Sequence, residues 1–179
     1  MSDITDLNTL KSALGSYAKD IKLNLSAVLR EDPGSGLSQV QIAATALASA
    51  YATQHDDVIR AIEAETKEYL SDADIEAAKA ATTIMGMNNV YYRFVHLVGD
   101  EDYAKLPAGL RMNVIGNPGV EKVDFELYSL AVSAINGCGM CIESHVHQVT
   151  KHGVSKAGVQ HSIRIAAVLN AAAQALKIG

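Results

Sequence analysis

Apolar residues recur at the spacing of an α-helix through almost the whole chain, and no convincing strand pattern appears. The first 30 residues show the helical spacing clearly, at Leu7, Leu10, Leu14, Tyr17, Ile21, Leu25 and Leu29. Alanine is concentrated at 42–52 and 165–175, and this small residue with high helix propensity favours close helix packing. We therefore predict an all-α fold and a single domain spanning residues 1–179.

Start and stop signals divide this helical pattern into segments. Ser38 and Gln41 have the form of a capping box, and Ser71 and Ser155 are further N-cap candidates. Glu31–Gly36, Met85–Asn89 and Asn136–Gly137 have the composition of breaks or turns. The predicted helical segments are 6–30, 38–53, 56–70, one from 71 to the break at 85–89, 89–98, 125–135 after an Asp124 cap, 138–151 and 155–177.

A loop-rich stretch at 99–122 separates two approximate halves, 1–98 and 110–179. A weak internal similarity links them at an offset of 51 residues, the difference between positions 135 and 84. Ile84–Phe94 then lies over Ile135–His145, and it is either a coincidence or the trace of a duplicated helical hairpin. In both cases only the second segment carries reactive side chains.

Charge and hydropathy exclude several classes of function. The net charge is −5 with no basic block, which argues against nucleic acid and anionic membranes as partners. No apolar run approaches the roughly 18–20 residues of a membrane span, and the first residues lack the zones of a signal peptide. We expect a cytoplasmic protein, a setting in which a disulfide cycles rather than persists.

The two cysteines of the chain, Cys138 and Cys141, stand three residues apart, and His145 follows four residues later. At 100° per residue, with Cys138 at zero, Cys141 falls at about 300° and His145 at about 340°, so the three share one helix face. A disulfide can close across this turn, and a neighbouring base can generate the reactive thiolate. The spacing therefore predicts thiol redox chemistry.

Other interpretations of the same residues remain open at this level. Two buried thiols can pack as small hydrophobic groups. A zinc site of Cys138, Cys141, His145 and His147 has the right ligand types, but His147 points to the opposite helix face. A three-ligand site completed by Glu126 or water remains an alternative. From spacing alone, Glu126 is an ordinary glutamate of a helix first turn.

The block from Phe125 to His145 resembles the alkyl hydroperoxide reductase AhpD family, part of a wider carboxymuconolactone decarboxylase-like group. Further matching stretches cover nearly the whole chain, at 17–25, 84–90, 109–113 and 117–119. The resemblance implies an all-helical fold with an internal duplication and a homotrimer. It also places the family's functional positions on Glu126, Cys138, Cys141 and His145.

The same resemblance implies an antioxidant peroxidase that reduces organic hydroperoxides with its own dithiol. It implies no tightly bound cofactor, because dihydrolipoamide on a lipoylated dihydrolipoamide acyltransferase would be the reductant, itself recharged by lipoamide dehydrogenase. An AhpC-type peroxiredoxin is the implied electron acceptor. Some family members carry a histidine directly before the second cysteine, whereas this chain has Met140, so the proton relay is expected to rest on Glu126 and His145.

We expect Cys141 to attack the peroxide, His145 to take its proton, Glu126 to orient that imidazole, and Cys138 to close the disulfide. Dihydrolipoamide is expected to reopen the ring at Cys138. Helix-dipole reasoning alone would instead favour the first cysteine as the more acidic one. Two other functions are kept as alternatives: a thiol–disulfide carrier with no peroxidase activity, and a helical module with a Cys/His metal site.

Overall fold

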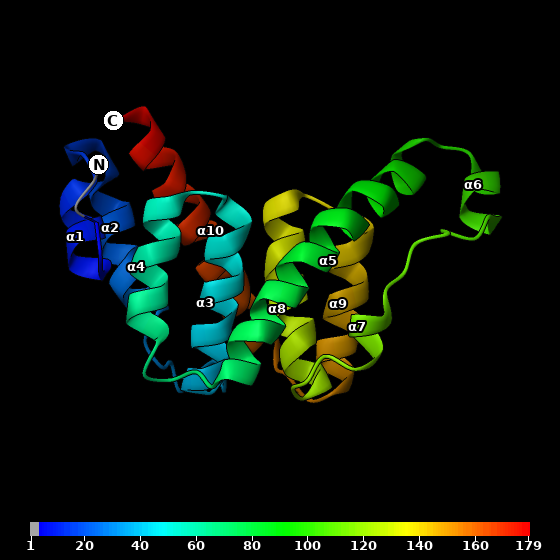
Figure 1. The fold of residues 1–179 in the computed structure, drawn as a ribbon, viewed down its shortest axis with the longest axis horizontal. Coiled ribbons are helices and arrows are strands. Elements are labelled where there is room, and N and C mark those ends of the chain that lie inside the picture. Colours follow the sequence, from blue (N-terminus) through cyan, green and yellow to red (C-terminus); the bar gives the residue numbers. More distant parts are fainter. Residues whose placement is uncertain (1–3) are drawn as a thin grey trace.

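The computed structural model describes residues 4–179, and this part of the chain forms ten α-helices, one short 3₁₀ helix and no strand (Figure 1). The all-α prediction is confirmed. The elements are α1 (Leu7–Ala13), η1 (Ser16–Ala18), α2 (Lys19–Val28), α3 (Gln39–Thr53), α4 (Asp56–Thr66), α5 (Asp72–Leu97), α6 (Glu101–Lys105), α7 (Asn113–Gly116), α8 (Lys122–Asn136), α9 (Gly139–Lys151) and α10 (Lys156–Ile178).

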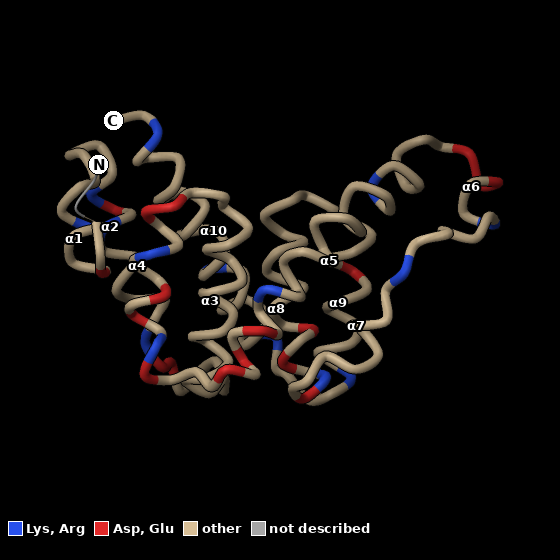
Figure 2. The backbone as a smooth tube through the Cα atoms, viewed as in Figure 1, with Lys and Arg blue, Asp and Glu red and all other residues tan. Residues whose placement is uncertain are grey.

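The core is centred on α3 and α8, which pack against each other in the middle of the molecule. Residues 42–50 of α3 and 125–133 of α8 are buried without interruption, so both helices are covered on all sides. Such helices need neighbours all round, and α10 and α5 pack against both of them. Helices from both predicted halves therefore share one hydrophobic core. Figure 2 shows acidic and basic residues interspersed along the chain around this largely uncharged centre.

The predicted helix starts at Ser38, Ser71 and Ser155 are confirmed. Ser38 and Gln41 form a reciprocal capping box, and Ser71 and Asp74 form a second one. Ser155 accepts a hydrogen bond from the Gly158 N–H at 3.0 Å. Each cap satisfies backbone donors that the first helical turn leaves unpaired. α8 begins at Lys122 after Glu121, so the prediction of Asp124 as its cap is wrong, and Asp124 lies in the first turn instead.

Two predicted boundaries are also wrong. The stretch 6–30 is not one helix, because extended backbone at Leu14 separates α1 from η1 and α2. This bend lets both helices bury leucines, among them Leu10 and Leu25. The predicted break at 85–89 is absent: α5 runs unbroken for 26 residues from Asp72 to Leu97. Its buried face, which includes Ala77, Ala81 and Met85 at i, i+4 and i+8, keeps the helix continuous against its neighbours.

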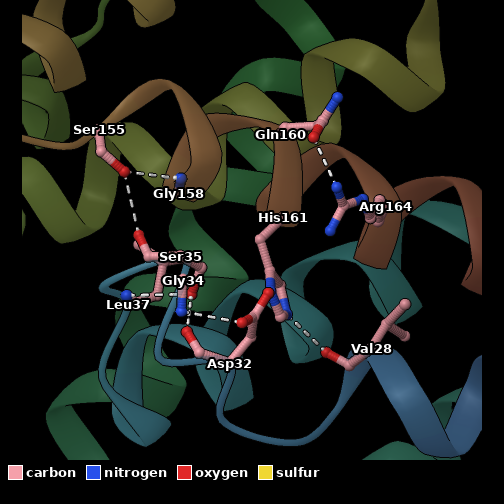
Figure 3. A network of polar contacts seen from close by, with 10 residues as sticks. All are labelled: Val28, Asp32, Gly34, Ser35, Leu37, Ser155, Gly158, Gln160, His161 and Arg164. Carbon is pink, nitrogen blue, oxygen red and sulfur yellow. Dashed lines mark hydrogen bonds and ion pairs between the residues drawn. The ribbon is translucent and has the colours of Figure 1, made fainter.

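The connection between α2 and α3 is tied to the start of α10 (Figure 3). His161 makes a 2.9 Å hydrogen bond from its Nε2 to the carbonyl of Val28, and Ser155 donates to the carbonyl of Ser35. Gly158 is required at this crossing, since a Cβ there would lie 2.9 Å from the Ser35 carbonyl oxygen. His161 is buried at this contact, which gives it a structural role.

Residues 99–122 contain two short helices and otherwise no regular structure, as the composition predicted. The end of α5 and the segment through α6 project from the body as an arm, on the side away from both chain ends (Figure 1). α6 buries none of its residues, and a ring contact between Phe94 and Tyr103 links it to α5. Within residues 4–179, no helix has both the length and the apolar character needed to cross a bilayer.

Candidate active site

The cysteine pair lies where α8 gives way to α9. Gly137 ends α8 in the left-handed conformation, with φ of 70°, and its N–H bonds back to the carbonyls of Ala134 and Ser133. Cys138 is the N-cap of α9, and its own N–H bonds to the Ser133 carbonyl at 3.2 Å. Glycine is favoured at this position because other residues adopt the left-handed region only at a cost. The turn predicted at Asn136–Gly137 is confirmed.

Cys138 and Cys141 form a disulfide, with Cα atoms 5.3 Å apart. The backbone N–H of Cys141 donates to Cys138 Sγ at 3.3 Å, so Cys138 caps the first turn of α9 with its sulfur. Cys138 is fully buried, whereas Cys141 keeps 6% of its surface exposed. The redox pair expected from the spacing is therefore geometrically formed.

Glu126 of α8 and His145 of α9 meet beside this disulfide. His145 Nδ1 lies 2.6 Å from Glu126 Oε2, and both side chains are buried, with 9% and 5% of their surfaces exposed. A buried carboxylate requires such a partner, so Glu126 is more than a helix-terminal residue. The structure thus brings the four predicted residues together, and their roles stay predictions.

Met85 completes the surroundings of the imidazole and was not found by the sequence analysis. Its Sδ lies 3.2 Å from His145 Nε2, so the two ring nitrogens face a carboxylate and a thioether, both acceptors. The residue could have been recognised only by its place on the buried face of a helix that runs through the predicted break.

A pocket of about 380 Å³ opens onto Cys141 and His145. Cys138 does not line it, so the second cysteine is the accessible sulfur. The walls combine thioether and aliphatic side chains with a few polar groups. They are formed by Met85, Asn88, Tyr92, Met112, Ile115, Lys122, Glu126, Met140, Cys141, Ser144, His145 and Gln148.

A network of hydrogen bonds, buried at Asn89 and Ser133, holds the redox turn against α5. Asn89 donates to Ser133 Oγ at 2.9 Å and accepts from Asn136 Nδ2 at 3.0 Å. Arg93 donates to the carbonyl of Asn136 at 2.6 Å. Because Ser133 and Asn136 directly precede the Cys138 turn, these bonds fix the turn to a long rigid helix.

The metal-site alternative finds no support in this geometry. Among residues 4–179, no group of three or more His, Cys, Asp and Glu side chains is arranged to hold an ion. The two candidate thiolate ligands are joined to each other, and His147 is exposed.

Comparison with known proteins agrees with the site. The model of the carboxymuconolactone decarboxylase family matches residues 101–178. An alkyl hydroperoxide reductase AhpD of Coxiella burnetii is 58% identical over 168 residues, covering 94% of this chain and 95% of that protein. Proteins of the same name from Rhodospirillum centenum and Hyphomonas neptunium are 57% and 56% identical over 170 residues, covering 95% of this chain and 90% and 93% of theirs. This chain therefore belongs to the alkyl hydroperoxide reductase AhpD family, a family of enzymes.

Proposed function

We propose that this protein is an antioxidant peroxidase that reduces organic hydroperoxides through a dithiol–disulfide cycle of Cys138 and Cys141. One observation carries the proposal: Cys141, the cysteine of the pair that lines the pocket, lies in a largely apolar cavity next to a buried Glu126–His145 pair. Such a pocket suits an alkyl group, and the disulfide is the product of the cycle.

In the first half of the cycle, the Cys141 thiolate attacks the terminal oxygen of R–O–O–H. A sulfur–oxygen bond forms, the oxygen–oxygen bond breaks, and the alcohol ROH leaves with a proton delivered through His145. Cys141 becomes a sulfenic acid. Cys138 then attacks this sulfur: the sulfur–sulfur bond forms, the sulfur–oxygen bond breaks, and the hydroxide leaves as water with the proton of the Cys138 thiol.

The acid–base work falls to Glu126 and His145. His145 stands one helical turn after Cys141, the spacing at which two side chains on a helix meet. The Glu126 carboxylate stabilises the imidazolium that forms when the ring takes the thiol proton, as an orienting carboxylate does in other nucleophile–base pairs. No imidazole precedes Cys141 here, because Met140 occupies that position.

The burial of Cys138 changes the expected site of reductant attack. A dihydrolipoamide thiolate entering the pocket meets Cys141, so we place the attack there rather than at Cys138. The new bond joins lipoyl sulfur to Cys141, and the Cys138 thiolate leaves at the N-terminus of α9, where backbone N–H groups stabilise it. The second lipoyl thiol then displaces Cys141 and closes the lipoyl ring.

The proposed electron supply is a lipoylated dihydrolipoamide acyltransferase, recharged by lipoamide dehydrogenase at the expense of NADH. The reduced pair would also pass electrons to the disulfide of an AhpC-type peroxiredoxin. No tightly bound cofactor is needed, since the lipoyl group arrives on its carrier. The relatives named AhpD support this assignment, and a cytoplasmic location remains a prediction that fits such partners.

We also propose a homotrimer, built with the arm at the end of α5. This arm exposes apolar side chains that a single chain does not cover, and exposed apolar surface of this kind marks interfaces. They are Val90, Phe94, Leu97, Val98, Tyr103, Leu106 and Leu110. Light scattering should give the trimer mass for the native chain and a smaller species for Leu97→Asp.

The function is tested by NADH consumption in a mixture of this protein, free lipoamide and lipoamide dehydrogenase, before and after tert-butyl hydroperoxide is added. Peroxide-dependent turnover that disappears in Cys138→Ser and Cys141→Ser supports the peroxidase. Reduction of the disulfide by dihydrolipoamide without peroxide turnover would instead identify a thiol–disulfide carrier that serves a peroxiredoxin.

A further inference from the structure

Two adjacent asparagines of α5 differ sharply in their hydrogen bonding. Asn89 is 1% exposed and uses both ends of its amide, toward Ser133 and Asn136. Asn88 is 4% exposed, yet its Oδ1 is buried without a hydrogen-bond partner among residues 4–179. A buried polar atom left unpaired disfavours folding, and of the six such residues in the described part of the chain Asn88 is the one that lines the pocket at Cys141.

Asn88 lies in the wall of the pocket that opens onto Cys141 and His145. It follows Met85 by three residues, which places it one helical turn further along the same face of α5. Met85 is the residue whose sulfur touches His145 Nε2. The unpaired amide is therefore about one turn away from the edge of the imidazole.

The chemistry of the pocket identifies the group that the amide would bind. A hydroperoxide carries one O–H donor and two acceptor oxygens at its head, and a carboxamide offers one acceptor and one donor group side by side. Met112 and Ile115, which also line the pocket, suit the alkyl tail. A dithiol reductant presents sulfur, a weak hydrogen-bonding atom, to this part of the site.

We propose that Asn88 is a substrate-binding residue that holds the hydroperoxide head during attack by Cys141, an inference that rests on the proposed peroxidase function. Oδ1 accepts from the terminal O–H, and Nδ2 donates to the inner oxygen, on which negative charge develops as the oxygen–oxygen bond breaks. The sulfur–oxygen bond forms at the terminal oxygen, and the inner oxygen leaves with its alkyl group and a proton as the alcohol.

The test separates the two half-reactions in Asn88→Leu, a variant of similar size without polar atoms. Prereduced protein is mixed with tert-butyl hydroperoxide, or with hydrogen peroxide, and thiol loss is followed in a single turnover. We expect oxidation to slow about tenfold with both peroxides, because leucine cannot make the Nδ2 hydrogen bond that strengthens on the inner oxygen in the transition state. Asn88→Gln should recover part of the rate, and disulfide reduction by dihydrolipoamide should match the native rate.

The neighbouring asparagine provides the matched control for stability. Asn88→Leu removes an unpaired amide, so its melting temperature should equal or exceed the native value by about 2–4 °C. Asn89→Leu leaves the buried Ser133 and the partly buried Asn136 without their hydrogen-bond partner, so it should melt at a lower temperature. A gain in stability together with a loss of oxidation rate is expected of a residue whose polar group binds the substrate rather than stabilises the fold.

Three results would overturn the assignment. Native oxidation rates in Asn88→Leu would show that the amide does not touch the peroxide. A defect confined to the dihydrolipoamide step would assign the amide to the reductant instead. A loss of stability as large as that of Asn89→Leu would make Asn88 structural. If the native protein itself does not react with peroxide, the proposed function fails, which is a distinct result.

Discussion

Segments 84–94 and 135–145 share a sequence pattern but have different structures. The first lies entirely within the continuous helix α5, whereas the second breaks at Gly137 and restarts as α9 at the cysteine pair. The difference does not support two copies of one hairpin at this place. The two segments have different roles: the second carries the cysteine pair, and α5 supplies the side chains that hold and surround the turn at that pair. Met85, Asn88 and Asn89 all face the region of α8 and α9.

A glycine in a similar sequence setting does not always break a helix. Gly86 is exposed within α5 and has no positive φ, while Gly137 has φ of 70° and is followed by a residue that caps a new helix. Whether the helix continues past the glycine depends on whether the following residues can bury a helical face. α5 has such a face, and the chain after Gly137 turns back to place α9 beside α8.

Removing the sulfurs of the second segment should have the largest effect. Cys138→Ser should leave Cys141 able to react, so that peroxide produces a sulfenic acid that a dimedone probe traps, while turnover is abolished. Cys141→Ser should yield no comparable adduct. Mass spectrometry of the labelled chains checks this, and stronger labelling of Cys141→Ser would reverse the order of the two cysteines.

Glu126→Gln should sharpen the assignment of the buried pair. The amide can still accept from His145 Nδ1–H but carries no charge, so oxidation by peroxide should slow about 10- to 100-fold. Single-turnover thiol loss measures the effect. Glu143→Gln makes the same change on the exposed side of α9 and should leave the rate unaltered. Equal rates in the two variants would remove Glu126 from the mechanism.

Alanine at the two equivalent glycines should change stability in opposite directions. Gly137→Ala places a side chain in the left-handed region and should destabilise by about 1–2 kcal/mol. Gly86→Ala should stabilise by about 0.5–1 kcal/mol, because an added Cβ meets nothing within 4 Å and glycine is unfavourable inside a helix. Urea unfolding of both variants checks the signs, and a shared sign would contradict the structural difference.

Helices α5 and α8 each have an aspartate in the first turn, Asp74 and Asp124, and we expect the two to affect stability in opposite ways. Burial raises the pKa of Asp124 in α8, despite the opposing hydrogen bond from Gln41, and Asp74 and Glu121 add to the rise. A carboxyl group whose folded pKa is raised favours its neutral form in the native state, so its ionisation at neutral pH lowers stability. This penalty is absent below the unfolded pKa and appears as pH rises through the folded one.

Asp124→Asn should therefore stabilise slightly at pH 7, by less than about 0.5 kcal/mol, and lose that advantage near pH 3. Asp74→Asn removes a member of the α5 capping box and should instead destabilise at pH 7. Thermal unfolding at the two pH values checks both. An advantage of Asp124→Asn that persists at acid pH would rule out ionisation as its cause.

Sequence patterns predicted most of the fold and three residues of the site, Cys138, Cys141 and His145, whereas Glu126 was expected only from the family resemblance. Helix starts at Ser38, Ser71 and Ser155 follow from local caps, and the cysteine pair is recognisable from its spacing. The continuous α5 was missed, because the glycine and asparagines at 86–89 suggest a turn when their neighbours are unknown. Met85 and Asn88 were missed for the same reason, since a methionine and an asparagine on a helix carry no signal of what they face.

Features that depend on interactions over a few residues can be predicted from the amino-acid sequence: the helices, their caps, and a dithiol within one turn of a histidine. Which side chains meet across the chain depends on how the helices pack. Glu126 is separated from His145 by 19 positions in the sequence, and Met85 is separated from it by 60. Helix packing brings both side chains to the imidazole, and no local sequence pattern encodes these contacts. The same packing buries Cys138 completely and leaves Cys141 at the pocket, because accessibility depends on the helices around a residue rather than on the residue itself.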